Sequence, residues 1–493
     1  MKNPLSRGGL TGFLLLVAVP TALIAFLWAT RANEVSALQL LLAFGLIFVP
    51  WQAYLNWRRE GRPELPLFGM IALMYFLYFG IPLFWGDLTI TTNLSPLGQE
   101  VPTSAITAAL MMAFLGVCSL YIGMKSKIGR MFTPRNLEAV GLRPGRLSYI
   151  RLVLVVGSFI NFSDGFTNFV GQGGQQAFAI LVSTIPLLAF AILFRNYLKG
   201  EAKKIDKILI LGFLGTRFLS GMSSGWLGVF TSILIICAAL YIAERKRIPR
   251  FALLVVVAFT LFFQVGKDDF RRVYWRDQAG GAGRLERMQF WIDSSSSKWV
   301  EAIDDPTGET IKEALSPSVN RLSLLSQSGN VIDKTPSVVA YQYGQLYSYM
   351  FITFVPRFIW PDKPSVNEAN QYYQVAYGLT SEENLEGVSI AVGTLTEGYM
   401  SFGWWGALGI MFLSGIFFDF FQSTFLSRAS GQILSALGVV LLPQFLSIES
   451  QLAQYMGGIV QQILFSLIIM LPALSLRRSQ VRFMKPALEY GSK

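Results

Sequence analysis

Four short segments of this chain carry residues that could bind an anion beside a proton acceptor. Arginine presents a planar, permanently charged fork of N–H donors that matches phosphate oxygens. A carboxylate close by can accept a proton from a reacting hydroxyl. The four segments are 215–225, 267–276, 354–364 and 394–406. Their candidate anion-binding residues are Arg217, Arg271, Arg272, Arg276, Arg357 and Lys363, and their candidate proton acceptors are Glu397 and Asp268.

The first two segments also have ordinary structural interpretations. If the helix that precedes Lys267 continues outward, Asp268, Arg272 and Arg276 share one face at i, i+4 and i+8. That face could be a cation site or a solvated helix end with ion pairs. Arg217 lies in an apolar run, where an arginine is costly unless it meets water or an anion. It could instead reach lipid head groups.

The other two segments are equally open to two interpretations. Pro356, Pro361 and Pro364 predict an extended turn that holds Arg357 close to Lys363, or a structural turn with incidental charges. Glu397 could act as a base, or it could cap the helix that follows it.

Metal or cofactor chemistry has little support in the residue types. The chain has no histidine and two cysteines, Cys118 and Cys237, each inside an apolar run. The adjacent Asp268 and Asp269 could suggest a divalent metal, but neighbouring side chains on a helix diverge. We therefore expect no metal, no cofactor and no disulfide framework.

The composition predicts a membrane protein. Of the 493 residues, 53% are hydrophobic and 14% are charged, with a mean hydropathy of +0.47. An average soluble protein has about 25% charged residues. These values exclude an ordinary soluble enzyme and a disordered chain. The net charge of +11 is expected to lie in cytoplasmic loops and does not indicate a nucleic-acid partner.

Twelve apolar runs are long enough to predict transmembrane helices. The fifth and seventh are short and carry Arg151 and Arg217. The runs are 10–30, 36–56, 67–85, 103–124, 147–163, 176–194, 208–222, 226–243, 251–266, 399–421, 431–448 and 453–474.

The basic residues predict which ends are cytoplasmic. With both termini inside, the cytoplasmic segments hold 27 Lys and Arg, whereas the short outer loops and helix ends hold Arg31 and Arg217. This excess is the positive-inside pattern. The predicted organisation is nine helices in 1–266, a large outer loop or cap in 267–390, three helices in 391–474 and a basic cytoplasmic tail in 475–493. An interfacial or re-entrant helix is expected near 337–355, because a crossing there would place the basic tail outside.

The motifs of the C-terminal half resemble a known family. The stretches Pro356–Pro364 and Glu397–Gly406, together with the span count and the large outer loop, resemble the O-antigen and exopolysaccharide repeat-unit polymerases of the Wzy type, which are related to the O-antigen ligases. The resemblance covers about 240 C-terminal residues; the first 200 match in hydropathy only. It implies an all-α polytopic membrane protein with a GT-C-like fold and an active site that faces the periplasm of a bacterial inner membrane.

The resemblance also implies an activity and partners. The substrates would be undecaprenyl-diphosphate-linked oligosaccharides embedded in membrane lipid, and a protein that regulates chain length is a further expected partner. Arg217, Arg271, Arg272 and Arg357 would hold the diphosphate and stabilise its departure, with help from Arg276 and Lys363. Glu397 is the first choice of base and Asp268 the second. Attack in line would make the enzyme an inverting glycosyltransferase.

Three alternatives stay open at this point. The ligases share the architecture and the outer arginines, but they carry an outer histidine that this chain lacks. A transporter or flippase of the lipid-linked glycan is a second alternative, although we find no clear internal repeat and the charges gather at the outer face. A structural subunit of an export complex is the third, and for it the arginines would be dispensable.

Overall fold

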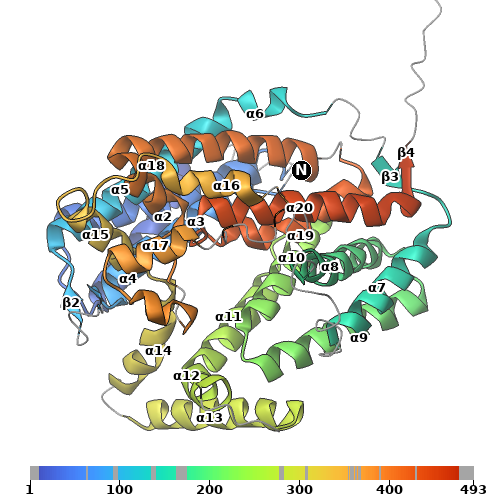
Figure 1. Ribbon diagram of the computed structural model, residues 1–493, viewed down its shortest axis with the longest axis horizontal. Helices are drawn as coiled ribbons and strands as arrows, with labels where there is room; N and C mark the ends of the chain where they lie inside the picture. Colours follow the sequence, from blue (N-terminus) through green and yellow to red (C-terminus); the bar gives the residue numbers. More distant parts are fainter. Residues whose placement is uncertain are drawn as a thin grey trace, which may run out of the picture.

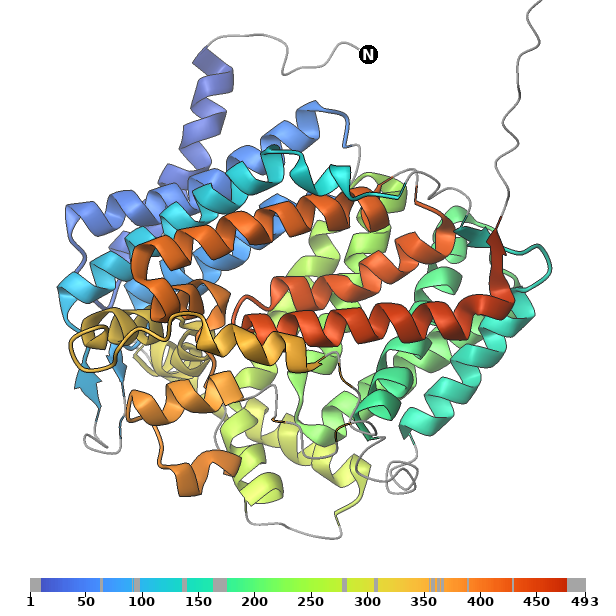
Figure 2. The same cartoon turned by 45° about the horizontal axis from the view of Figure 1, so that its top comes forward.

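The protein is described by a computed structural model, in which it is almost entirely helical (Figures 1 and 2). The structure describes residues 10–62, 65–90, 92, 98–134, 140–162, 175–276, 282–305, 309–353, 355, 360, 364, 368–387, 390–427 and 430–476.

All twelve apolar runs lie in helices or helix pairs. The helices before the predicted cap are α1 (Leu10–Ala29), α2 (Ala37–Arg59), α3 (Leu67–Tyr75), η1 (Phe76–Gly80), α4 (Ile81–Trp85), α5 (Thr103–Lys125), α6 (Ile128–Met131), α7 (Leu147–Phe162), α8 (Gln175–Lys199), α9 (Lys204–Ser224), α10 (Leu227–Arg245) and α11 (Arg250–Val265). Those after it are α18 (Gly393–Phe421), η7 (Gln422–Leu426), α19 (Gln432–Leu446) and α20 (Leu452–Met470).

Within the described residues, six helical segments are long and apolar enough to cross a membrane. They are α2, α3 with η1 and α4, α5 with α6, α10, α18 with η7, and α20 with the residues up to Ala473. A seventh is added if α11 and the helix beginning at Lys267, which are bent by 55°, count as one span. The fold is therefore all-helical and compatible with a membrane protein, while the count of twelve spans stays a prediction.

The closest helix packing joins α5 to α18. Gly123 and Gly415 allow the two backbones to meet, since a Cβ on Gly123 would lie 2.1 Å from the Phe412 carbonyl oxygen and one on Gly415 would lie 2.2 Å from that of Leu120. Ser119 Oγ adds a hydrogen bond to the Leu408 carbonyl at 2.7 Å. Small residues at such contacts are typical of helix pairs in membranes.

Helix α18 is two helices joined by a sharp break. Phe402 and Gly403 have non-helical backbone angles, and Gly403 has φ = +63°. The segment before the break folds back onto the segment after it, so that Gly398 contacts the backbone of Gly406. Glu397 therefore lies in a short helical segment, 393–401, that is tucked against the bundle.

The predicted cap, 267–390, is a series of short helices. They are α12 (Lys267–Arg271), η4 (Arg272–Arg276), α13 (Arg284–Asp304), α14 (Glu309–Leu322), α15 (Leu325–Lys334), η5 (Gln345–Tyr347), α16 (Ser348–Thr353), α17 (Glu368–Ala376) and η6 (Glu382–Gly387). The helix predicted near 337–355 is shorter than expected, because it covers only η5 and α16. Residues 337–344 form turns instead, with Tyr343 and Gly344 both at positive φ, and α16 packs along α20.

Helices α18 and α20 run alongside each other, with the cap helices α15 and α17 near one of their ends (Figure 1). We call this the cap end of the bundle and the opposite end the basic end. At the cap end, the turn after α1 bonds to α4 through Ala32 N–H and the Phe84 carbonyl, and the turn after α4 bonds to the cap through Asp87 N–H and Asn320. At the basic end, Arg130 pairs with Asp419, and β3 (Val140–Leu142) pairs antiparallel with β4 (Leu474–Leu476). A second antiparallel pair, β1 (Thr89–Ile90) with β2 (Gln99–Glu100), lies at the cap end.

Candidate functional site

Glu397 is fully buried at the cap end of the bundle. Its Oε2 accepts a hydrogen bond of 2.8 Å from the backbone N–H of Leu452, the first residue of α20. The first N–H groups of a helix have no partner within that helix. Glu397 therefore caps α20 and not its own helix, which differs from the capping role suggested by the sequence.

The other oxygen of Glu397 is buried without a hydrogen-bond partner among the described residues. Among the described residues, Glu397 Oε1 and the Tyr347 hydroxyl have no hydrogen-bond partner although both are buried. Burial raises the pKa of Tyr347, Glu397 raises it further, and Ser401 lowers it. The phenol is therefore neutral. Buried atoms without a partner are uncommon in native structures and often mark a place for water or a ligand.

A group of cations lies at the same end of the bundle. Lys267 is buried, and the charges of Arg271, Arg321, Asp268 and Glu449 all act on its ammonium group. Helix α14, which carries Arg321, packs against both α11 and α4. We call Lys267, Arg271 and Arg321 the cap-end cations. They come from two segments more than 40 residues apart and are held by different helices.

Glu449 offsets part of this charge through an ion pair. Arg321 pairs with Glu449 through contacts of 2.8 Å and 3.4 Å. Burial lowers the pKa of Arg321, but the ion pair with Glu449 raises it by more. The guanidinium therefore stays charged. Glu449 lies three residues before Leu452, so the turn between α19 and α20 touches both Arg321 and Glu397.

Helix α12 differs from the single face that the sequence predicts. Arg272 is exposed over 67% of its side chain and pairs with Asp269 at 3.0 Å, not with Asp268. Asp269 also pairs with Lys298 at 2.8 Å and accepts a hydrogen bond from Ser294 at 2.9 Å. Residues 272–276 form a π-helix, and its wider turn removes the i, i+4 spacing between Arg272 and Arg276. The side chain of Arg276 lies outside the described residues.

Aromatic packing fixes α12 against α9 and α13. Gly225 ends α9 at φ = +71°, and a Cβ there would lie 2.5 Å from the ring of Phe270. Trp275 donates a hydrogen bond of 3.2 Å to the Ser224 carbonyl and stacks on Trp226. The Arg271 guanidinium lies 4.8 Å from the ring centre of Trp275. Arg271 is thereby oriented by a cation–π contact.

Arg217 lies apart from this arrangement. Its guanidinium is 5.3 Å from the ring centre of Phe213 and donates a long hydrogen bond of 3.5 Å to the Ser183 carbonyl. It is seven residues before Ser224, which is about 10 Å along a helix. The contacts of Arg217 are therefore with α8 and α9, away from α12.

Two predicted anion-binding residues, Arg357 and Lys363, lie outside the described residues. Within the described part of the chain, no three His, Cys, Asp or Glu side chains gather where they could hold a metal ion.

Sequence reasoning missed three members of the site. Lys267 could have been found, because it directly ends an apolar run. Arg321 and Glu449 are 128 residues apart, and neither stands in a local pattern that predicts their pairing.

Asp268, the second candidate base, is exposed at the cap end.

The comparisons with known proteins give one family. A family model described as "Domain of unknown function (DUF8712)" matches residues 77–476. The matched region extends from η1 to β4 and includes Glu397 and the cap-end cations. No curated protein and no solved structure matches the chain.

Proposed function

The chain belongs to the DUF8712 family, a domain of unknown function, and we propose that it is a membrane glycosyltransferase that polymerises lipid-linked oligosaccharide repeat units. The donor would be a growing glycan on undecaprenyl diphosphate. The acceptor would be an incoming lipid-linked unit. This activity accords with the resemblance of Pro356–Pro364 and Glu397–Gly406 to the Wzy-type polymerases.

One observation carries the proposal. Arg271 and Arg321 both act on the charge of Lys267, at the end of the bundle where Glu397 is buried with one oxygen that has no partner among the described residues. Three cations with two compensating carboxylates, Asp268 and Glu449, leave a net positive charge that suits a diphosphate. A membrane protein offers such a site to a substrate whose lipid tail stays in the bilayer.

The proposed reaction needs two kinds of group. A hydroxyl of the acceptor sugar attacks the anomeric carbon of the donor. A new C–O bond forms and the bond to the diphosphate oxygen breaks, leaving polyprenyl diphosphate. The cations stabilise the charge that builds on this leaving group, and a carboxylate takes the hydroxyl proton. Because attack and departure are in line, the anomeric configuration inverts.

The residues take the following roles in this proposal. Arg271, Arg321 and Lys267 bind the diphosphate, and Arg217, Arg357, Arg276 and Lys363 are further anion-binding candidates. Glu397 is the first candidate base, with Tyr347 positioned to hydrogen-bond the acceptor. Asp268 is the second. Arg272 has a lesser part than the sequence suggests, since it is exposed and paired with Asp269.

The location follows from the charge distribution. The basic end of the bundle would face the cytoplasm with both termini, and the cap end would face the periplasm of a bacterial inner membrane. The twelve-span, GT-C-like topology is part of this proposal.

The deciding experiment uses purified protein in proteoliposomes with one lipid-linked repeat unit. A polymerase makes a ladder of longer glycans on the lipid without an energy source or a partner protein. A flippase would move the unit without lengthening it, a ligase would need a different acceptor, and a structural subunit would do neither. Any of those three results would overturn the proposal.

A repeat of the ladder assay with a metal chelator tests the predicted lack of a metal requirement. We expect the ladder to persist, because the cations occupy the place of a divalent ion. Loss of the ladder and its recovery with added magnesium would assign charge stabilisation to a metal.

A further inference from the structure

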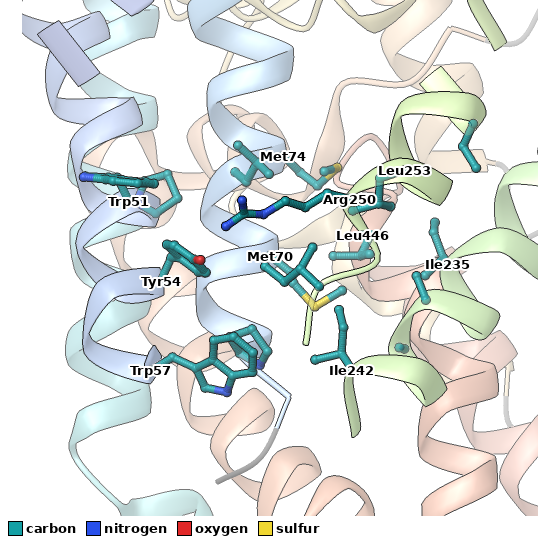
Figure 3. Close-up of a pocket in the computed structure, with 18 of the residues that line it drawn as sticks. Trp51, Tyr54, Trp57, Met70, Met74, Ile235, Ile242, Arg250, Leu253 and Leu446 are labelled. Atoms are coloured by element: carbon teal, nitrogen blue, oxygen red, sulfur yellow. The ribbon is translucent and has the colours of Figure 1, made fainter. Parts of the chain in front are cut away.

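A long apolar groove lies between two walls of the helix bundle, away from the candidate site (Figure 3). One wall is formed by α2 and α3 and the other by α10 and α11, and the cavity has a volume of about 740 Å³. Figure 3 shows Trp51 and Tyr54 on one wall facing Ile235 and Leu253 on the other. This volume is in the range of sites that bind small organic ligands.

The two walls of the groove are joined at its base and at its basic end. Helix α19 packs against both α10 and α3, and its Leu446 lines the groove. At the basic end, Arg62 donates a hydrogen bond to the Lys246 carbonyl and ties the two loops together. Its walls include α2, α3 and α10, which are long and apolar enough to cross a membrane, so the groove would be open to acyl chains of the bilayer.

Two arginines from helix ends at the basic end of the bundle line this groove. Arg58, in the last turn of α2, and Arg250, the first residue of α11, both line it. In Figure 3 the Arg250 side chain reaches from α11 toward the wall formed by α2 and α3. Neither arginine forms an ion pair with any residue in the described ranges. The nearest acid along α10, Glu244, is already paired with Arg195.

An apolar groove lined by two guanidinium groups that form no ion pair within the described ranges matches a molecule with an anionic head and long apolar tails. We propose that the groove binds one anionic glycerophospholipid. Its phosphodiester lies between Arg58 and Arg250, and its acyl chains run between Trp51, Met70 and Leu253 toward Leu446. This lipid would fill the gap between the two walls, and the proposal does not depend on the glycosyltransferase activity.

The charge distribution favours a lipid from the leaflet at the basic end. Arg58, Arg59, Arg62, Lys246 and Arg247 all belong to this end. Clustered basic residues beside apolar helices attract anionic lipids. A polyprenyl diphosphate would be expected with its head among the cap-end cations instead, at the opposite end of the bundle.

The test measures which lipid stays bound to the purified protein. The full chain is reconstituted in nanodiscs with equal amounts of phosphatidylglycerol and phosphatidylcholine, extracted into mild detergent and analysed by native mass spectrometry. We expect one retained phosphatidylglycerol per chain. Each of Arg58→Gln and Arg250→Gln should lower its retention about fivefold, and the double variant about 25-fold.

Matched variants separate this site from general surface charge. Arg59→Gln removes the same charge one residue away from Arg58, outside the groove lining, and should retain the lipid as the unaltered protein does. Ala238→Phe places a ring within the groove and should exclude the acyl chains while Arg58 and Arg250 remain. If Ala238→Phe does not fold, the lipid retention of the Arg58→Gln, Arg250→Gln and Arg59→Gln variants still tests the proposal.

Three results would overturn the proposal. They are equal retention of both phospholipids, equal loss in Arg59→Gln and Arg58→Gln, or preferential capture of an added polyprenyl diphosphate that depends on Arg250. The last result would assign the groove to the donor lipid. The ladder assay with the Arg58→Gln and Arg250→Gln proteins shows separately whether polymerisation survives loss of the lipid.

Discussion

The carboxylate of Glu397 accepts a hydrogen bond of 2.8 Å from the backbone N–H of Leu452. An acid from the short first segment of α18 thus completes the beginning of α20. The same carboxyl group has a second oxygen with no partner among the described residues. A structural role and a chemical role can therefore belong to different oxygens of one side chain, and substitutions can separate them.

Glu397→Gln should keep the structure and remove the activity. A glutamine oxygen can still accept from Leu452, so we expect the midpoint of thermal unfolding to stay within a few degrees of the unaltered value. It cannot take a proton from the acceptor hydroxyl, and the ladder assay should lose about 10²–10⁴ in rate.

Glu397→Ala is the matched control for the structural role. It leaves the Leu452 N–H buried without a partner, which costs about 1–3 kcal/mol. We expect a clearly lower unfolding midpoint in detergent than for Glu397→Gln. If Glu397→Gln polymerises normally, the base is another residue, and Asp268→Asn becomes the next variant to assay.

The two partners of one ion pair should respond in opposite ways to substitution. Arg321→Gln removes a cation from the proposed diphosphate site and should raise the donor KM about 10- to 100-fold, as loss of a charged hydrogen bond does. Glu449→Gln removes the carboxylate that competes for Arg321, so donor binding should stay equal or become tighter. Steady-state kinetics with varied donor measures both.

A purely structural ion pair would give a different result. In that case Arg321→Gln and Glu449→Gln would lower stability and activity together and by similar amounts. Arg272→Gln is the control for charge alone, because Arg272 is exposed and pairs with Asp269. We expect it to change the donor KM by less than about threefold.

Arg217 can be tested against the other basic residue of the predicted outer loops and helix ends. Arg217→Gln should shorten the glycan ladder if the lipid diphosphate passes this residue, whose partners within the described ranges are an aromatic ring and one long hydrogen bond. Arg31→Gln should leave the ladder unchanged, since Arg31 is exposed and already bonds to the Trp28 carbonyl at 2.7 Å. Full-length ladders from both variants would remove Arg217 from the mechanism.

Local sequence patterns predicted the helices well because each apolar run must be helical to satisfy its own backbone. They predicted turns and contacts poorly. The break at Phe402–Gly403 and the turns at 337–344 are set by how segments fold back on one another. The i, i+4 rule joined Asp268 to Arg272, but Arg272 pairs with Asp269 at i, i+3, and the π-helix at 272–276 changes the spacing only from Arg272 onward.

Only the part of the candidate site that lies in local motifs was predicted from the sequence. Glu397 and Arg271 stand in motifs that are visible in the sequence. Arg321 and Glu449 meet across 128 residues, and Lys267 joins them through the packing of α14 against α11. Contacts of this kind depend on tertiary structure, so a single sequence does not reveal them.

The contact between α5 and α18 should tolerate no added methyl group. Gly123→Ala and Gly415→Ala each place a Cβ within about 2.2 Å of a backbone oxygen of the facing helix, and backbone cannot move aside as a flexible side chain can. Overpacking of this kind costs about 1–3 kcal/mol or more. We expect a lower unfolding midpoint in detergent for both variants.

Gly212→Ala in α9 is the matched control, because nothing lies within 4 Å of a Cβ at that position. Alanine is the better helix former by about 1 kcal/mol in water, so this variant should unfold at the same temperature as the unaltered protein or slightly higher. The break that tucks Glu397 into the bundle lies on α18, which α5 holds in place. Loss of the α5–α18 contact should therefore also weaken the ladder assay, whereas Gly212→Ala should not. Normal stability of Gly415→Ala would mean that the two helices are farther apart than described here, and the position of Glu397 would then lack its support.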